Sequence, residues 1–104
     1  METIEKHDLS HPLFFYLALQ CAHEPMQAPQ RFIDKYAKLG FPKQQQVEYA
    51  FSAVIDEGIG NVTAALKAKG MWDNTLMVVV ADNGGPSFSD QAAATNYPLR
   101  GGRC

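Results

Sequence analysis

Two polar stretches of the chain carry side chains that could bind a metal ion or act on a substrate. In the first, Asp82 and Asn83 follow the apolar run 75–81 and precede the glycine pair 84–85. A carboxylate and an amide carbonyl are the hard oxygen ligands that Ca²⁺ and Mg²⁺ prefer. The same four residues also form good turns, because Asp and Asn side chains bond their own backbone. From spacing alone, an ordinary turn is the favoured interpretation.

The second stretch, QCAHEP at 20–25, follows the apolar run 13–19. His23 has the chemistry to donate a proton or bind an anion, but a lone histidine at such a place more often makes a structural hydrogen bond in a loop. For Cys21, a buried thiol at the end of a strand is favoured over a nucleophile, since only His23 lies nearby to lower its pKa. The spacing of Cys21 and Cys104 fits neither a zinc site nor a CxxC redox motif.

The elements that must position these side chains follow a strand–helix–strand pattern. Residues 13–19 and 75–81 are continuous apolar runs of strand length, as in a parallel sheet buried on both faces. Between them, residues 43–70 have apolar side chains at steps of three and four, which predicts a helix with one apolar stripe. Pro42 stands where this helix would begin and Gly70 where it would end.

The remaining segments are less regular. Gly58 and Gly60 interrupt the predicted helix and indicate either a close packing contact or a break. The segment 25–42 is predicted as loop with a short helical piece around Phe32. The tail 84–104, rich in Gly, Ala, Ser and Asn, is predicted as an irregular loop.

The strand–helix–strand order predicts that the two polar stretches meet. Its crossover should be right-handed and its strands parallel, so the carboxyl ends of both strands share one edge. Ligands of open α/β sheets bind at that edge. His23 and Glu24 follow the first strand, and Asp82 and Asn83 follow the second. We therefore expect these four polar groups to converge.

The composition of the chain narrows the classes of protein to which it can belong. The chain has 104 residues, which suits one small domain, and 46% of them are hydrophobic, which argues against disorder. The net charge of −2 provides no basic patch for nucleic acid. The apolar runs are too short for a transmembrane segment. The first ten residues, METIEKHDLS, lack the apolar core of a signal peptide.

Three blocks of the sequence resemble the sulfatase family, and within it the arylsulfatase B-like (N-acetylgalactosamine-4-sulfatase-like) branch. They are HPLFFYLALQCAHEPMQAP, DEGIGNVTAALKAKGMWDNTLMVVVADNGG and NYPLRGG, in the family's order and spacing. The resemblance implies an α/β fold, a βαβ portion of a mostly parallel sheet flanked by helices. Residues 1–104 would be an incomplete sulfatase catalytic domain with no second domain.

The resemblance also implies roles for single residues. Asp82 and Asn83 match the pair that helps to hold Ca²⁺, which binds the sulfate group of the substrate. His23 matches a pocket histidine that contacts the sulfate ester and assists the leaving oxygen. Arg103 stands where the family's L-R-G-x-K motif has a sulfate-binding lysine, with the same charge but different donor geometry. Asn61, in an N-x-T sequon, matches a glycosylation position of animal lysosomal members.

Other parts of the family's machinery are missing. The family's nucleophile is a formylglycine made from the cysteine of a C-x-P-x-R motif, and these 104 residues contain no such motif. The paired aspartates that complete the calcium site are also absent, and two side chains cannot supply the six to eight oxygens that Ca²⁺ takes. We therefore expect a fragment, truncated at both ends and inactive alone.

The full-length parent implied by the resemblance is a calcium-dependent sulfuric ester hydrolase, lysosomal or secreted. It would act on a sulfated small molecule or a sulfated glycan. Two alternatives remain. The missing nucleophile favours a non-catalytic binding or interaction module derived from a sulfatase. A phosphate-ester hydrolase of the same superfamily is the other, and the blocks LALQCAHEP and NYPLRGG argue against it.

Overall fold

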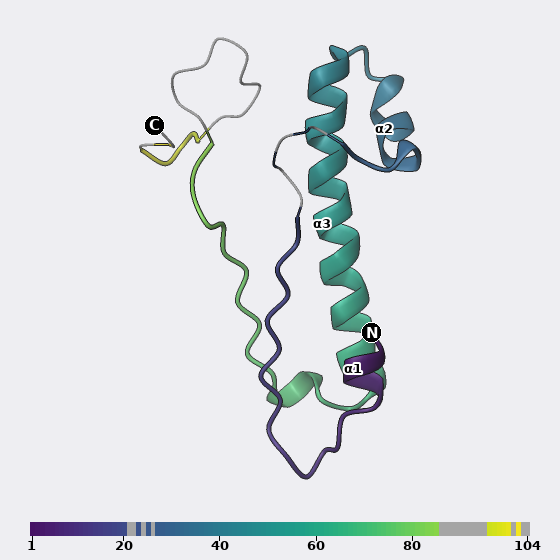
Figure 1. Cartoon of the computed structure of the whole chain (residues 1–104), viewed down its shortest axis with the longest axis vertical. Helices are drawn as coiled ribbons and strands as arrows, with labels where there is room; N and C mark the ends of the chain where they lie inside the picture. Colours follow the sequence, from purple (N-terminus) through teal and green to yellow (C-terminus); the bar gives the residue numbers. More distant parts are fainter. Residues whose placement is uncertain (21–22, 24, 26, 86–95, 101, 103–104) are drawn as a thin grey trace.

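The computed structural model describes residues 1–20, 23, 25, 27–85, 96–100 and 102. Within these residues the helical elements are α1 (Glu2–Glu5), α2 (Gln30–Ala37), α3 (Lys43–Ala68) and the 3₁₀ helix η1 (Trp72–Asn74). The molecule is elongated, with extents of 52 × 31 × 23 Å, and α3 runs along its long axis (Figure 1).

The long helix α3 confirms the prediction for residues 43–70 at both ends. Pro42 is its N-cap, and Gly70, with φ of +73°, follows its last turn. The Gly70 N–H donates to the Lys67 carbonyl at 3.0 Å, and the Met71 N–H donates to the Leu66 carbonyl at 2.9 Å. These are the two bonds of a Schellman motif. Glycine adopts the left-handed conformation without steric cost, so Gly70 ends the helix.

Neither glycine inside α3 breaks the helix. A Cβ added at Gly58 would lie 3.7 Å from Leu19 Cδ1, whereas one added at Gly60 would meet nothing within 4 Å. Of the two alternatives, the close packing contact is confirmed at Gly58. This glycine lies where the segment 13–20 passes against α3.

The short helix α2 confirms the helical piece predicted around Phe32. It lies beside the N-terminal half of α3 (Figure 1), where Phe32, Ala50 and Phe51 are buried. The Arg31 guanidinium donates to Glu57 Oε1 at 2.7 Å and so joins the two helices. We call α2 and α3 together the helical pair.

A second apolar cluster lies at the C-terminal end of α3. Its buried members are Ile4 of α1 and Val62 and Leu66 of α3. Partly buried apolar residues pack against them: Leu13, Ala65, Met71, Trp72 and Met77. The Lys69 ammonium also donates to the Glu5 carbonyl at 2.6 Å. The first ten residues, which are mostly polar, thus contribute one core residue, Ile4, that their composition did not predict.

The residues between α1 and the first apolar run form a local turn. The His7 ring lies 2.9 Å from the His11 carbonyl oxygen, and the Ser10 hydroxyl lies 2.9 Å from His11 Nδ1. The Ser10 backbone N–H donates to the Asp8 carboxylate at 2.9 Å and is the main reason why the pKa of Asp8 is lowered. These contacts stabilise the turn before residue 13.

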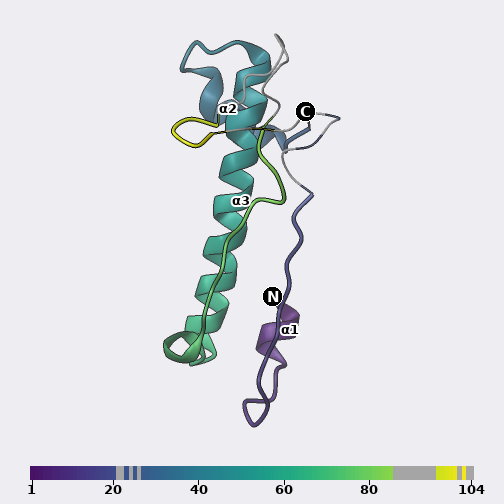
Figure 2. The ribbon, with the colours of Figure 1, turned by 90° about the vertical axis from the view of Figure 1, so that its left-hand side faces the viewer.

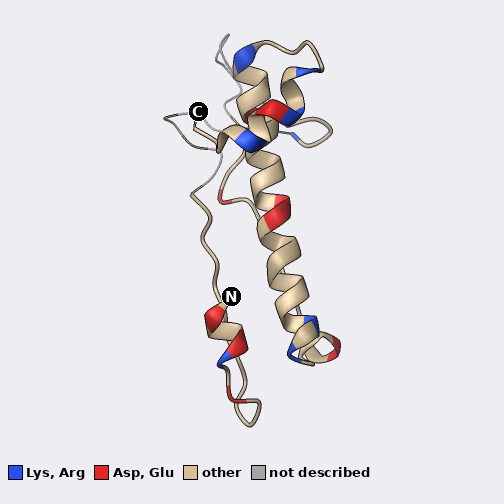
Figure 3. Ribbon diagram, turned by 90° about the vertical axis from the view of Figure 1, so that its right-hand side faces the viewer, with Lys and Arg blue, Asp and Glu red and all other residues tan. Residues whose placement is uncertain are grey.

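Segments 13–20 and 75–81 are extended, and we call them the two extended segments. Both run along α3, in the same direction as each other and opposite to α3 (Figures 1 and 2). This is the predicted strand–helix–strand course. The described residues contain no β-ladder, so the parallel sheet stays a prediction. Neither segment contains a charged residue, and the charges in Figure 3 lie mainly on the helices and in the turns.

The described part of the chain contains the helices α1, α2, α3 and η1. None of them is both long enough and apolar enough to span a bilayer.

Candidate metal and substrate site

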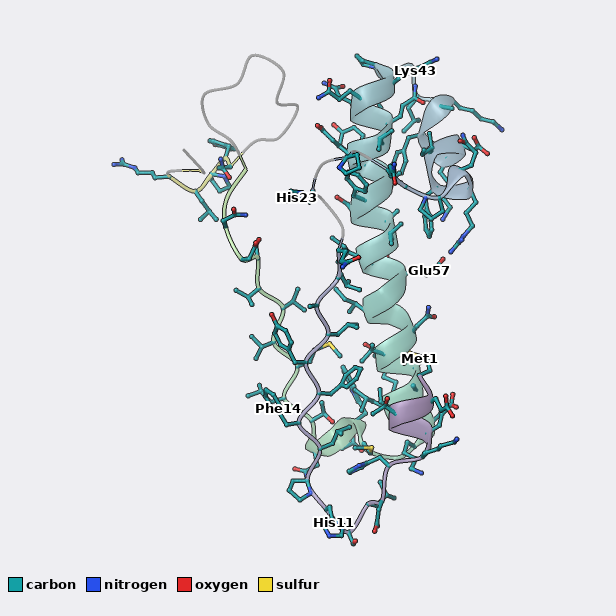
Figure 4. All side chains as sticks on the ribbon, viewed as in Figure 1. Met1, His11, Phe14, His23, Lys43 and Glu57 are labelled. Carbon is teal, nitrogen blue, oxygen red and sulfur yellow. The ribbon has the colours of Figure 1, made fainter. Side chains whose placement is uncertain are left out.

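A long, only partly enclosed groove of about 1810 Å³ runs along the two extended segments and α3, and its lining includes both His11 and His23. Ile55 and Ile59 of α3 contribute apolar side chains to it, and His23, Asp82 and Asn83 contribute polar ones. In Figure 4, His23 lies beyond the end of segment 13–20 and far from His11, which precedes that segment. The structure therefore brings three of the four predicted polar residues to one groove. Glu24, the fourth, lies outside the described residues.

The segment 75–81 leads directly into the Asp82–Asn83 pair. Both residues are exposed, and Asn83 Nδ2 donates to Asp82 Oδ1 at 3.0 Å. The two side chains therefore reach the same point in space. The direction of an amide group is assigned from its hydrogen bonds. A half-turn of the Asn83 amide would bring its oxygen next to the carboxylate, an arrangement that a cation between them would stabilise.

This geometry fits part of a calcium site. Two oxygens about 3 Å apart can both lie within the usual 2.3–2.6 Å of one Ca²⁺ ion. Asp82 and Asn83 offer at most three side-chain oxygens, fewer than the six to eight oxygens that Ca²⁺ takes, so the donor set is incomplete. Among the residues that the structure describes, no group of three or more His, Cys, Asp or Glu side chains could hold a metal ion. The pair therefore fits the ion as two of several ligands.

Asn96 also belongs to the site, and the sequence analysis missed it. Its Oδ1 accepts from the Gly85 N–H at 2.8 Å, and its Nδ2 donates to the Gly85 carbonyl at 3.0 Å. A Cβ at Gly84 would lie 2.9 Å from Asn96 Oδ1 and 3.2 Å from Gly102 Cα. The only available signal was the NYPLRGG block, which does not show what Asn96 contacts.

Asn61, another predicted residue, does not line the groove. Asn61 lies on α3 and is exposed, as a glycosylation acceptor must be. Arg103, Cys21 and Cys104 lie outside the described residues, so the predictions for them stay predictions. Arg100 is described and exposed.

A smaller hollow of about 540 Å³ lies between α2 and α3. Lys35, Asp56 and Glu57 contribute charged side chains to it, and Phe32 and Tyr36 contribute aromatic ones. None of the predicted site residues lines this hollow. The candidate chemistry therefore belongs to the larger groove.

Comparisons with known proteins agree with the resemblance at the level of the family. Residues 1–103 match the family model described as Sulfatase. The chain is 36% identical over 102 residues to arylsulfatase J of Mus musculus, which covers 98% of this chain and 16% of that protein. It is 31% identical over 78 residues to the uncharacterized sulfatase YdeN of Escherichia coli strain K12, which covers 73% of this chain and 14% of that protein.

The first match extends over nearly the whole chain and the second over about three quarters of it, but each covers only a small part of the relative. The chain spans about a sixth of the length of the curated relatives that it matches. No solved structure matches it. The family match covers residues 1–103, far more than half of the sequence. The chain therefore belongs to the sulfatase family.

Proposed function

We propose that this chain forms part of a calcium-dependent sulfuric ester hydrolase of the arylsulfatase type. The observation that carries the proposal is the shared groove. His23 follows one extended segment, Asp82 and Asn83 follow the other, and all three line the same groove. A metal-binding pair and a proton donor along one groove are two of the parts that ester hydrolysis uses, and the nucleophile is the third.

The residues have separate roles in this proposal. Asp82 and Asn83 bind the metal through a carboxylate and an amide oxygen. When bound, Ca²⁺ supplies positive charge that holds the sulfate oxygens. His23 hydrogen-bonds the ester oxygen and gives a proton to the departing alcohol. Ile55 and Ile59 contribute apolar side chains to the same groove.

Several finer features are part of the same proposal. The nucleophile would be a formylglycine outside these 104 residues, because the chain contains no C-x-P-x-R motif. The extended segments would be strands of a parallel α/β sheet, as in the arylsulfatase B-like branch. Arg103 would take the place of a sulfate-binding lysine. The parent would be lysosomal or secreted, glycosylated at Asn61, and would act on a sulfated small molecule or glycan.

The test uses a chimera, in which this chain replaces the matching residues of an active full-length sulfatase. In the chimera, Asp82→Ala should lower kcat/KM for p-nitrophenyl sulfate at least about 100-fold, because loss of a metal ligand exceeds the effect of an altered outer-shell partner. Asp73→Ala is the matched control, since Asp73 lies in η1 and does not line the groove. The 104-residue chain alone should show no turnover.

Two results would overturn this assignment. One is activity of the Asp82→Ala chimera within a few-fold of the unsubstituted chimera. The other is metal-dependent turnover by the isolated chain. A loss of the same size in Asp73→Ala would show that the substitutions act through folding.

The proton-donor role of His23 predicts a dependence on the leaving group. In the chimera, His23→Ala should cost about 10²- to 10⁴-fold in kcat with an alkyl or sugar sulfate, the usual range for general acid catalysis. The cost should be much smaller with p-nitrophenyl sulfate, because nitrophenolate departs without a proton. Asp73→Ala, outside the groove, is again the control. An equal loss with both substrates would assign His23 to binding alone.

A further inference from the structure

Asn96 makes a two-point contact with the backbone of a single residue. Its side-chain oxygen accepts from the Gly85 N–H at 2.8 Å, and its side-chain nitrogen donates to the Gly85 carbonyl at 3.0 Å. Both bonds are partly buried, so water competes with them less than at an open surface. Asparagine has a donor and an acceptor side by side. Aspartate retains only the acceptor, and alanine has neither.

The contact between Asn96 and Gly85 also depends on the absence of a side chain at Gly84. A Cβ at Gly84 would lie 2.9 Å from Asn96 Oδ1, closer than real Cβ atoms approach another heavy atom. It would also lie 3.2 Å from Gly102 Cα, so the backbone at that point leaves no room. Residues before and after the contact thus fit together only because position 84 has no side chain.

The contact lies next to the proposed metal ligands. Gly84 and Gly85 directly follow Asp82 and Asn83. Asn96 also accepts, through its own carbonyl, a hydrogen bond of 2.7 Å from the Leu99 N–H. Asn96 therefore contacts the turn after Asp82 and Asn83 with its side chain, and it holds the start of segment 96–100 with its backbone.

We propose that Asn96 is a positioning residue that clips the Gly85 backbone and so holds the turn that carries Asp82 and Asn83. Its part in metal binding rests on the proposed function, but the clip itself does not. Without the clip, the turn samples more backbone conformations, and metal binding must then order it. Asn96 itself does not bind the metal. Its loss therefore weakens calcium binding without removing a ligand.

The first experiment measures the clip in the 104-residue chain, with no metal and no activity involved. Amide hydrogen exchange at Gly85, followed by NMR, should speed up about tenfold in Asn96→Ala, because the amide loses its acceptor. Asn96→Asp keeps the acceptor and should stay close to the unsubstituted chain. Asn61→Ala, an exposed asparagine on α3, is the control. Equal exchange rates at Gly85 in the unsubstituted chain and Asn96→Ala would overturn the proposal.

The second experiment uses the chimera and its calcium dependence. Asn96→Ala should raise the Ca²⁺ concentration for half-maximal activity about tenfold, the size expected of an outer-shell change. At saturating Ca²⁺ its kcat should recover to within a few-fold. A purely structural role would instead lower kcat at every Ca²⁺ concentration, and that result would overturn the proposal.

Asp82→Ala separates this inference from the proposed function. If Asp82→Ala leaves the calcium dependence unchanged, the proposed metal site fails. If Asp82→Ala abolishes activity while Asn96→Ala leaves the calcium dependence unchanged, the positioning role alone fails.

A double-mutant cycle tests the contact between Gly84 and Asn96 directly. Gly84→Ala should impair calcium binding because its methyl group collides with Asn96. Asn96→Ala removes the colliding amide, so the double variant should be less impaired than the product of the two single effects. Gly60→Ala, where an added Cβ meets nothing within 4 Å, is the control. Multiplicative effects of Gly84→Ala and Asn96→Ala would contradict the contact.

Discussion

The helical pair and the two extended segments both carry large apolar side chains, but they bury them very differently. Phe32 of α2 is 2% exposed, whereas Phe14 of segment 13–20 is 92% exposed. In segment 75–81, Leu76 is 89% exposed and Val80 is 82% exposed. The chain therefore completes the packing of one region and not of the other.

The difference arises from how helices and strands pair their backbone hydrogen-bonding groups and bury their apolar faces. A helix pairs its own backbone groups and needs a partner for one apolar face only, and α2 and α3 provide this for each other. A strand needs neighbours for its backbone, and a strand of a parallel sheet needs them on both faces as well. Phe14 and Tyr16 are more exposed than Phe15 and Leu17, so α3 covers one side of segment 13–20. Nothing in the described part of the chain covers the other side.

The largest expected effect is on the helical pair. Phe32→Ala should lower the free energy of unfolding by about 3–5 kcal/mol, because it leaves a cavity between α2 and α3. Phe14→Ala, the same change at an exposed position, should cost less than about 0.5 kcal/mol. Urea unfolding followed by circular dichroism at 222 nm measures both. Equal costs would break the contrast between the two regions.

A smaller effect is expected from the exposed side of segment 75–81. Exposed apolar strands promote association between chains. The double substitution Leu76→Thr and Val80→Thr keeps residues that favour extended backbone, removes apolar surface and should weaken self-association several-fold. Size-exclusion chromatography with light scattering over a range of concentrations measures the change. Val62→Thr, at a buried position, is the control and should reduce stability instead.

Unchanged association in the Leu76/Val80 double variant would show that this surface does not drive contact between chains. The contrast in burial between the helical pair and the extended segments would then rest on segment 13–20 alone.

The smallest effect is expected from the ion pair within the helical pair. Arg31 and Glu57 are 2.7 Å apart, but their side chains are 64% and 47% exposed. A double-mutant cycle of Arg31→Ala and Glu57→Ala should give a coupling of only about 0.2–1 kcal/mol, reduced by salt. The cycle is needed because the Arg31 guanidinium also lies 4.4 Å from the Phe32 ring centre. A coupling above about 2 kcal/mol would make charge, and not packing, the main link between α2 and α3.

The helices were largely predictable because their signals are local. Pro42 and Gly70 mark the ends of α3, and the spacing of its apolar residues marks its faces. The direction of the two extended segments also followed from the strand–helix–strand order. Whether they pair in a sheet did not follow, because pairing depends on neighbouring strands and the described residues contain no ladder.

The candidate site was predictable in part. His23, Asp82 and Asn83 were identified from their places after the apolar runs, and the structure puts them along one groove. Asn96 was missed because nothing near it in sequence shows that it bonds Gly85, eleven positions away. Ile4 was missed for the same kind of reason, since a single apolar residue in a polar leader has no period.

The sequence by itself determined the extent of α3, the two extended segments and the chemistry at their ends. These depend on backbone conformation and on the spacing of neighbouring residues, which a linear pattern records. Only the tertiary structure decided that Asn96 clips Gly85, that Gly84 has no room for a side chain and that Ile4 is buried. Those contacts join residues far apart in the chain, and they exist only where folding brings the two partners within bonding distance.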